Sequence, residues 1–414
     1  MKKRLLLLLL LSLFCFSVWS AEAPQYYGSS YMLDNYYVLD GNQGYSKAIL
    51  DNTKLSIVFI DSGDVLYQWF GHIGVLVETS SSQSILYDYG RFEFGPDFYV
   101  NFAMGRLWYR CVASYAFYEL TNAVQADRSI YVKPLNLTNE EKAAVLTFLN
   151  TNSSSEYSTY LYHNYKDNCS TRIRDLFDRL TEGSFKNEME SRDGYTYREM
   201  ANMVLSRNLF VLWTLDALQG RNVDLDQTYW DQMFLPSVFF EALDEYPEIA
   251  GETSVVYESK SSRSSYAEEP VNYTLAALAV AVGLGLIQLT LTTLRNKKKI
   301  VALLGSVYSF TLQFALGIIG SVLFFMMFFT LHDYTYLNEN ILFLNPVLLV
   351  TAFLSIKPEK HRKTLKFIYG LFMALILILI SLKLILHSVF IQNNWPQIIS
   401  LSAFYLFNFA STRL

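Results

Sequence analysis

The pattern of hydrophobic and polar positions divides the chain near residue 270. Before that point short apolar stretches alternate with polar turns, whereas beyond it most side chains are hydrocarbon. In the first part, runs of β-branched and aromatic residues bounded by Gly, Asp or Ser predict strands. The predicted strands are residues 55–60, 69–78, 84–90, 107–112 and 128–134, of which the second and third form a hairpin across a Ser-rich turn.

Helical spacing predicts further elements after these strands. Thr138-Asn139-Glu140-Glu141 is a capping box that begins a helix reaching to about residue 150. The next helix begins at Cys169, with Asp167 or Asn168 as its cap, and helical spacing returns over residues 196–218. The combination favours an α+β domain, in which helices pack on a mainly antiparallel sheet.

Five uncharged or nearly uncharged runs follow residue 270. They are Tyr273 to Leu294, Ile300 to Leu331, Ile341 to Ile356, Phe367 to Ile391, and Trp395 to Thr412. Each is long enough, or nearly so, to cross about 30 Å of hydrocarbon, although the third is short and contains Asn345-Pro346. We therefore expect an all-α membrane domain of about five transmembrane helices over residues 273–414.

Two independent signals predict the orientation of these runs. Basic residues gather at 295–299 and at 357–363, so the positive-inside rule places both loops in the cytoplasm. Residues 1–20 combine a basic start, a leucine run and small residues near the end, which predicts a secretory signal peptide; an uncleaved anchor is the alternative. Both signals place an extracytoplasmic domain, residues 21–250, outside, and a Ser-, Glu- and Tyr-rich linker over residues 251–272 follows it.

Composition excludes some classes of function. The formal net charge is −5 and there is no basic stripe, which argues against a nucleic-acid partner. Zinc-ligand spacing, a phosphate-binding glycine loop and a nucleophile-elbow serine are all missing from the sequence, so we expect no metal and no cofactor. Lys383 and His387 lie near the outer end of the fourth run, where snorkelling to the interface explains them.

Cys169 is the strongest candidate for chemistry. A thiol in the first turn of a helix lies at the positive end of the backbone dipole, which favours the thiolate. His72 begins a predicted strand and can act as the base, and Asp88 or Tyr89 on the neighbouring strand can orient its ring. Backbone N–H groups at the helix start, with Asn168, can hold an oxyanion.

Several alternatives remain open for these residues. His163, just before the cysteine helix, is a rival base, and Arg172 is either a surface ion pair or a phosphate contact. Cys111 and Cys169 can form a disulfide, which would remove the nucleophile. The outer loop of residues 332–340 is short and polar, and a solvated connector is its simplest interpretation.

Several motifs lie along the two parts of the chain. In the first part they are Phe70-Gly71-His72, Tyr89-Gly90-x-Phe92-x-Phe94, Phe102-Ala103-x-Gly105-Arg106-Leu107-x-Tyr109, Asp167-Asn168-Cys169-Ser170-Thr171-Arg172 and Phe234-Leu235-Pro236, and in the membrane part His332, Asn338, Asn340 and Asn345-Pro346. These motifs resemble those of the Bacteroides-type lipoprotein N-acyltransferases, the Lnb family. The order of His before Cys is that of circularly permuted NlpC/P60 papain-like domains. The resemblance covers most of the chain from about residue 50.

This resemblance implies an acyltransferase of the bacterial inner membrane, with its catalytic domain on the periplasmic face. The acyl donor would be a membrane phospholipid, and the acceptor would be the terminal amine of a diacylglyceryl-cysteine lipoprotein. Cys169 would be the nucleophile and His72 the base. Asp88 is expected as the third member, although relatives often have asparagine there. Asn168, Arg172, Tyr89, His332 and Asn338 are the expected substrate or oxyanion contacts.

Two other functions fit the same residues. NlpC/P60-type domains often cleave peptidoglycan, so an amidase or peptidase is the second hypothesis. A hydrolase of this kind does not need five membrane spans as an anchor, so we rank this hypothesis below the acyltransferase. A membrane-tethered binding module without catalysis is the third hypothesis.

Overall fold

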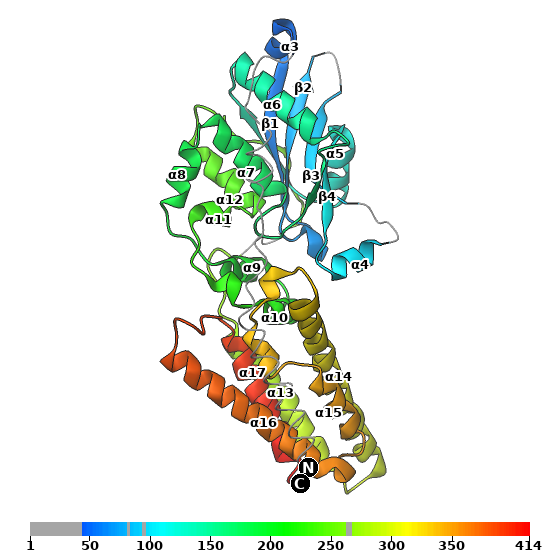
Figure 1. Cartoon of the computed structure of the whole chain (residues 1–414). Coiled ribbons are helices and arrows are strands. Elements are labelled where there is room, and N and C mark those ends of the chain that lie inside the picture. Colours follow the sequence, from blue (N-terminus) through cyan, green and yellow to red (C-terminus); the bar gives the residue numbers. More distant parts are fainter. Residues whose placement is uncertain (1–43, 81–82, 93–96, 262–266) are drawn as a thin grey trace. The chain divides into compact units, whose positions relative to one another are not determined.

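The structure, a computed structural model, describes residues 44–80, 83–92, 97–261 and 267–414. The predicted signal peptide lies outside the described residues. The described chain forms two compact units, which Figure 1 colours along the sequence. The sheet unit contains residues 44–204 and 226–269, and the helical unit contains residues 205–225 and 270–414.

A seven-stranded sheet forms the centre of the sheet unit (Figure 1). Its strands, in the spatial order β6-β4-β3-β2-β1-β5-β7, are β1 (Thr53–Ile60), β2 (His72–Thr79), β3 (Ile85–Arg91), β4 (Trp108–Tyr115), β5 (Ile130–Leu135), β6 (Thr159–Leu161) and β7 (Ser254–Tyr257). Every neighbouring pair is antiparallel, which confirms the predicted α+β fold. The five predicted strands are β1 to β5. The last strand, β7, lies inside the range expected to be a linker.

The central strands are apolar on both sides because both faces of the sheet are covered. In β1, Ile57 and Phe59 belong to one buried cluster, whereas Val58 and Ile60 belong to another. This alternation follows the two-residue period of a strand, and both faces are therefore shielded from water. Burial of each such side chain contributes about 1.5–3 kcal/mol.

Helices of the sheet unit cover the two faces. They are α3 (Lys47–Asp51), α4 (Phe98–Ala103), α5 (Ala116–Gln125), α6 (Asn139–Asn152), α7 (Cys169–Leu180), α8 (Ser184–Glu190), α9 (Tyr197–Leu205), α11 (Tyr229–Gln232) and α12 (Pro236–Ala242). The predicted capping box at the start of α6 is present, since the Glu141 N–H donates to Thr138 Oγ1 at 3.2 Å. In α7 the inward face is Ile173, Leu176 and Phe177, all buried, and the helix packs against β2 and β3.

The helix predicted over residues 196–218 is instead two helices. α9 ends at Leu205, and α10 (Leu209–Leu218) begins anew after Asn208. The break has a local cause, because the Asn208 side chain accepts hydrogen bonds from the N–H groups of Phe210 and Val211 and so caps a new helix. The two helices belong largely to different units, α9 to the sheet unit and α10 to the helical unit.

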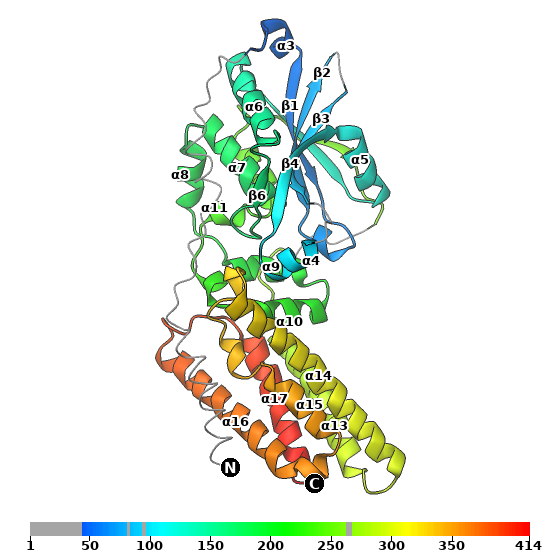
Figure 2. The ribbon, with the colours of Figure 1, turned by 45° about the vertical axis from the view of Figure 1, so that its right-hand side comes forward.

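Three of the five predicted runs form helices that are long and apolar enough to cross a membrane (Figure 2). They are α13 (Thr274–Thr293), α14 (Lys299–Phe329) and α16 (Pro358–Ile385). The other two runs form α15 (Val347–Ser355) and α17 (Trp395–Ser411), which are shorter. Pro346 precedes α15 and removes a backbone donor at its start. The helical unit therefore supplies three to five spans.

The two basic loops of the helical unit lie at the same end of it. Arg295, which follows α13, has its Nε 2.8 Å from Glu359 Oε1 in the first turn of α16. The shared position agrees with the sequence argument that both loops lie on one side of the membrane.

Residues 205–225 are held in the helical unit by backbone and amide contacts. The Ala217 carbonyl accepts hydrogen bonds from the side chains of Asn338 (2.9 Å) and Asn340 (3.0 Å). The Gly220 N–H donates to the Tyr334 carbonyl at 2.7 Å. A Cβ at Gly220 would come far inside contact distance of the Tyr336 carbonyl oxygen, so only glycine permits this approach.

Candidate active site

The thiol of Cys169 is fixed at the N-terminus of α7 by a fully engaged cap. Asn168 Oδ1 accepts from the N–H groups of Ser170 (2.8 Å) and Thr171 (3.0 Å). The Asn168 Nδ2 group donates to the carbonyls of Asn164 (2.9 Å) and Phe234 (3.0 Å). Both the oxygen and the nitrogen of this amide are therefore already hydrogen-bonded within the protein. Asn168 therefore orients the helix start, and any oxyanion contact has to come from another donor.

His72 and Asp88 form a hydrogen-bonded pair beside this helix start. His72 is the first residue of β2, and its Nε2 lies 2.8 Å from Asp88 Oδ1 on β3. Asp88 also accepts from the Gly90 N–H at 2.6 Å and faces Arg91 Nε at 2.8 Å. Burial opposes ionisation of Asp88, but His72, Arg91 and the Gly90 N–H outweigh it and hold the pKa of this carboxyl at about 2.

The Cys169 thiol lies close enough to the His72 ring to interact with it electrostatically. Asp88 engages Nε2 of this ring and leaves Nδ1 open. Burial works against protonation of the ring, but Asp88 and Cys169 together raise the pKa of His72 to about 10. A charged imidazolium beside the sulfur stabilises a thiolate. The structure thus brings together the three residues expected from sequence as nucleophile, base and orienting group.

Gly90 is a residue of this site that the sequence reasoning did not single out. A Cβ at position 90 would lie 2.5 Å from His72 Cε1 and 3.1 Å from Asp88 Oδ1. The imidazole therefore occupies the space that any other side chain at this position would need. The signal was present in the Tyr89-Gly90 motif, but a glycine in a strand has several common explanations.

A second missed residue, Tyr109 on β4, forms the aromatic side of the site. Its ring stacks on Tyr162 with centroids 4.2 Å apart, and burial together with the nearby Cys169 raises the pKa of Tyr109 to about 12. A cavity of about 280 Å³ opens beside this residue. Its lining mixes aromatic and basic side chains, among them Phe98, Phe102, Trp108, Arg106 and Arg110.

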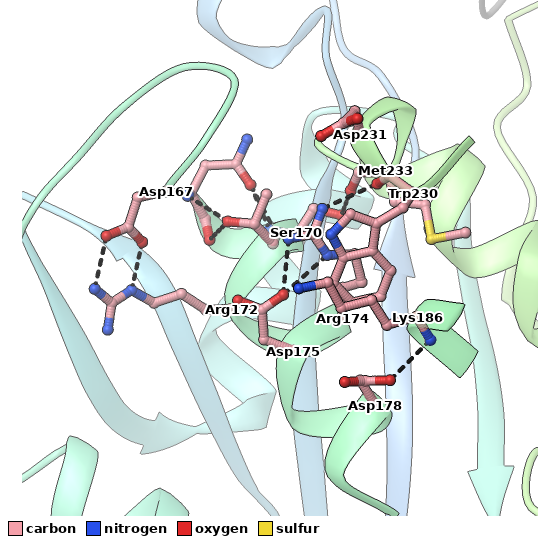
Figure 3. A network of polar contacts seen from close by, with 12 residues as sticks. Asp167, Ser170, Arg172, Arg174, Asp175, Asp178, Lys186, Trp230, Asp231 and Met233 are labelled. Atoms are coloured by element: carbon pink, nitrogen blue, oxygen red, sulfur yellow. Dashed lines mark hydrogen bonds and ion pairs between the residues drawn. The ribbon is translucent and has the colours of Figure 1, made fainter. Parts of the chain in front are cut away.

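Arg172 is a structural residue rather than an open substrate contact. Its Nε and Nη2 form a bidentate pair with Asp167 at 2.7 and 2.9 Å, and both side chains are buried (Figure 3). The guanidinium also lies 3.9 Å from the centroid of Tyr160. Planar stacking and bidentate pairing suit arginine and not lysine. Arg172 thereby ties the loop before Cys169 to the first turn of α7.

The other face of α7 is anchored to the segment around Trp230 (Figure 3). Ser170 Oγ donates to the Met233 carbonyl at 2.7 Å, and Arg174 Nη1 donates to the Trp230 carbonyl at 2.9 Å. Arg174 also lies 3.8 Å from the centroid of the Trp230 ring. The Phe234-Leu235-Pro236 motif follows directly, and its Phe234 carbonyl accepts from Asn168. This segment therefore holds the start of α7, and with it the thiol, in place.

The remaining candidate residues of the sheet unit support the fold. Tyr89 is 1% exposed and packs edge-on against Tyr160. His163 Nδ1 accepts from the N–H groups of Tyr165 and Lys166, both at 3.1 Å, so this ring supports the loop and does not face Cys169 as a base. Cys111 and Cys169 are both free thiols. Burial raises the pKa of the Cys111 thiol to about 12, which makes it unreactive.

His332 and Asn338 belong to the helical unit, and both are buried. His332 Nδ1 is 3.0 Å from Tyr334 Oη. Asn338 Nδ2 donates to Ala217, and its Oδ1 accepts from the Gln392 side chain at 3.0 Å. Both residues thus organise the outer loop, which is a packed structure and not a solvated connector. Among the described residues there is no group of three or more His, Cys, Asp or Glu able to hold a metal ion.

Two family models match the chain. The Lnb N-terminal periplasmic domain matches residues 42–203, and the Lnb transmembrane domain matches residues 271–413. Comparison with curated proteins gives no match. Comparison with solved structures gives none either. The first match spans strands β1 to β6 and the second spans the C-terminal helices, and the chain is therefore a multi-pass membrane protein with a periplasmic N-terminal domain that belongs to the Lnb family.

Proposed function

We propose that the protein is a membrane-bound lipoprotein N-acyltransferase. It would move an acyl chain from a phospholipid to the N-terminal amine of a diacylglyceryl-cysteine lipoprotein through a thioester on Cys169. The observation that supports the proposal is that the His72 ring lies 2.8 Å from Asp88 and interacts electrostatically with the nearby Cys169 thiol. The periplasmic location of this domain and the membrane helices of the same chain fit substrates that are both anchored in lipid.

In the first half-reaction, the Cys169 thiolate attacks the carbonyl carbon of a phospholipid ester. A C–S bond forms and the ester C–O bond breaks, while the His72 imidazolium donates its proton to the departing alkoxide. The product is a lysophospholipid, and the acyl group stays on Cys169. The high pKa of His72 means that the ring carries the proton this step requires.

In the second half-reaction, the lipoprotein amine attacks the thioester carbon. The neutral His72 takes a proton from the amine, the C–S bond breaks, and the thiolate and imidazolium are restored. Asp88 remains ionised throughout and stabilises the charged ring.

The oxyanion of both tetrahedral intermediates needs donors at the start of α7. Asn168 already takes the N–H groups of Ser170 and Thr171, so we assign this role to the backbone N–H of Cys169 itself. The aromatic cavity beside Tyr109 is the proposed site of the acyl chain, with Arg106 near the lipid phosphate. His332 and Asn338 are proposed to act indirectly, through the outer loop they hold together.

The proposal is tested by lipoprotein acylation in a bacterial strain that depends on this enzyme for its third acyl chain. Cys169→Ser and His72→Gln should each leave lipoproteins with two acyl chains, and Cys111→Ala should retain three by mass spectrometry. Incubation of the purified wild type with phospholipid alone should add one acyl group, located on Cys169 by peptide mapping. A Cys169→Ser protein that still completes the third chain would refute the mechanism, and release of peptides from peptidoglycan by the wild type would favour a hydrolase instead.

A further inference from the structure

A polar cavity of about 290 Å³ lies within the helical unit, at the end where the two basic loops meet. All of its lining residues belong to this unit, and all five long or apolar helices of the C-terminal part contribute. The polar members include Gln288 from α13, Gln313 from α14, Ser355 from α15, Tyr369 from α16 and Asn408 from α17. Polar side chains inside membrane helices are costly and mark binding sites or pathways.

Gln313 shows that this lining is incomplete without a ligand. Its side chain is 1% exposed, and its Oε1 accepts from Tyr369 Oη at 2.8 Å. In the part of the chain that the structure describes, its Nε2 has no hydrogen-bond partner. By contrast, Ser309 Oγ donates to Gln288 Oε1 at 2.8 Å, and Gln288 Nε2 donates to Thr292 Oγ1 at 3.4 Å. A buried amide donor pointing into a cavity calls for an acceptor oxygen there.

Two arginines lie at the end of the cavity that is next to the basic loops. Arg295 and Arg362 both line it, and Arg362 is exposed. Arg295 holds Glu359 with its Nε and reaches Ser306 Oγ with Nη2 at 3.4 Å. Guanidinium groups between membrane helices on the cytoplasmic side are the usual ligands of lipid phosphates.

Arg295 also borders an apolar groove between α14 and α15. This groove has a volume of about 460 Å³ and is lined by Leu303, Val307, Phe310, Phe353 and Ile356, besides Arg295 itself. One guanidinium therefore joins a polar cavity and an apolar groove. That combination matches the chemistry of a phospholipid, whose phosphate lies between a polar head and hydrocarbon tails.

We propose that the helical unit binds one anionic phospholipid from the leaflet on the side of the basic loops. Its phosphate lies on Arg295 and Arg362, oxygen atoms of its head group accept from Gln313, and one acyl chain occupies the α14–α15 groove. This site is separate from the Cys169 chemistry and holds its lipid without turnover.

The test measures lipid retained by the full-length protein carrying Cys169→Ser, so that no lipid is consumed. After delipidation, phosphatidylglycerol or phosphatidylcholine is titrated back in detergent, and bound lipid is counted by native mass spectrometry. One phosphatidylglycerol is expected to bind in preference to phosphatidylcholine. Arg295→Gln and Arg362→Gln should each weaken its binding by roughly fivefold. Arg362 is exposed and its Nε donates to the Thr412 carbonyl near the C-terminus, so its replacement is expected to leave the rest of the fold intact.

Gln313→Leu distinguishes a ligand site from a packing defect. Combined with Tyr369→Phe, so that no buried hydroxyl loses its acceptor, it should weaken phosphatidylglycerol binding while leaving the unfolding temperature of the delipidated protein unchanged or higher, because an unsatisfied donor is removed. Lys297→Gln, an exposed position on the same loop, is the matched control and should bind like the parent. Equal losses in Lys297→Gln and Arg295→Gln would overturn the proposal in favour of diffuse surface attraction. Equal affinity for soluble glycerol 3-phosphate would overturn the lipid assignment in favour of a small anion.

Discussion

Replacement of Gly90 by alanine is the sharpest test of the site geometry. The added Cβ would lie 2.5 Å from His72 Cε1, whereas ordinary contact begins near 3.4 Å, so the ring must retreat by about 0.9 Å (3.4 − 2.5). Asp88 Oδ1 is also only 3.1 Å from the same Cβ. A movement of this size would lengthen the 2.8 Å bond between His72 and Asp88 beyond hydrogen-bonding range.

The expected result is a loss of acyl transfer by roughly 100-fold, the usual consequence of displacing a catalytic group by about 1 Å. Overpacking should also lower stability, by about 1–3 kcal/mol. The assay follows thioester formation on Cys169 with phospholipid, together with thermal unfolding of the full chain. Gly283→Ala is the matched control, because a Cβ there meets nothing within 4 Å. Near-normal thioester formation in Gly90→Ala would show that the position of the ring in the structure is not the catalytic one.

Three further predictions follow from the same contacts. Asp88→Ala should lower acyl transfer by on the order of 100-fold. Asp88→Asn should keep most activity but shift the pH profile, because its amide oxygen still accepts from His72 Nε2 but no longer raises the pKa of the ring. Equal activity of the wild type and both variants would show that Asp88 does not orient the ring. Because the folded-state pKa of His72 is about 10 and its ordinary value 6.5, the protonated ring stabilises the fold fully below pH 6.5 and this stabilisation is lost as the pH rises to about 10. Wild-type unfolding temperature should therefore fall more steeply over that interval than that of His72→Gln, and parallel curves would contradict the shift. Arg172→Met should cost about 3–5 kcal/mol in denaturant unfolding because it leaves Asp167 buried without its partner, and the double variant with Asp167→Leu should recover most of this loss.

The sequence predicted the parts of the fold that depend on local pattern. Strands β1 to β5 have continuous β-branched or alternating runs, and Asn168 before Cys169 is a typical helix cap. Both features could therefore be predicted from neighbouring residues alone. The pairing of His72 with Asp88 followed from the hairpin of β2 and β3, which brings the two strands side by side.

Features that depend on distant partners were not predictable in this way. β7 is a short strand that pairs with β5, more than a hundred positions earlier in the chain. Asn168 was predicted to be an oxyanion donor, but its Nδ2 donates to the Phe234 carbonyl. That partner is remote in sequence and could not be predicted. Arg172 likewise looked exposed on a polar helix start, and its aromatic support by Tyr160 comes from another element.

The course of the backbone between the two units has a practical consequence for dissecting the protein. The described chain passes from one unit to the other at 204/205, 225/226 and 269/270, so three peptide segments join them. A truncation at residue 270 would keep α10 but remove Asn338 and Asn340, which bind the Ala217 carbonyl. The apolar helix would then be left without its partners and would promote aggregation. A soluble catalytic fragment should therefore be made by replacing residues 205–225 with a short flexible loop as well as by ending the chain before α13.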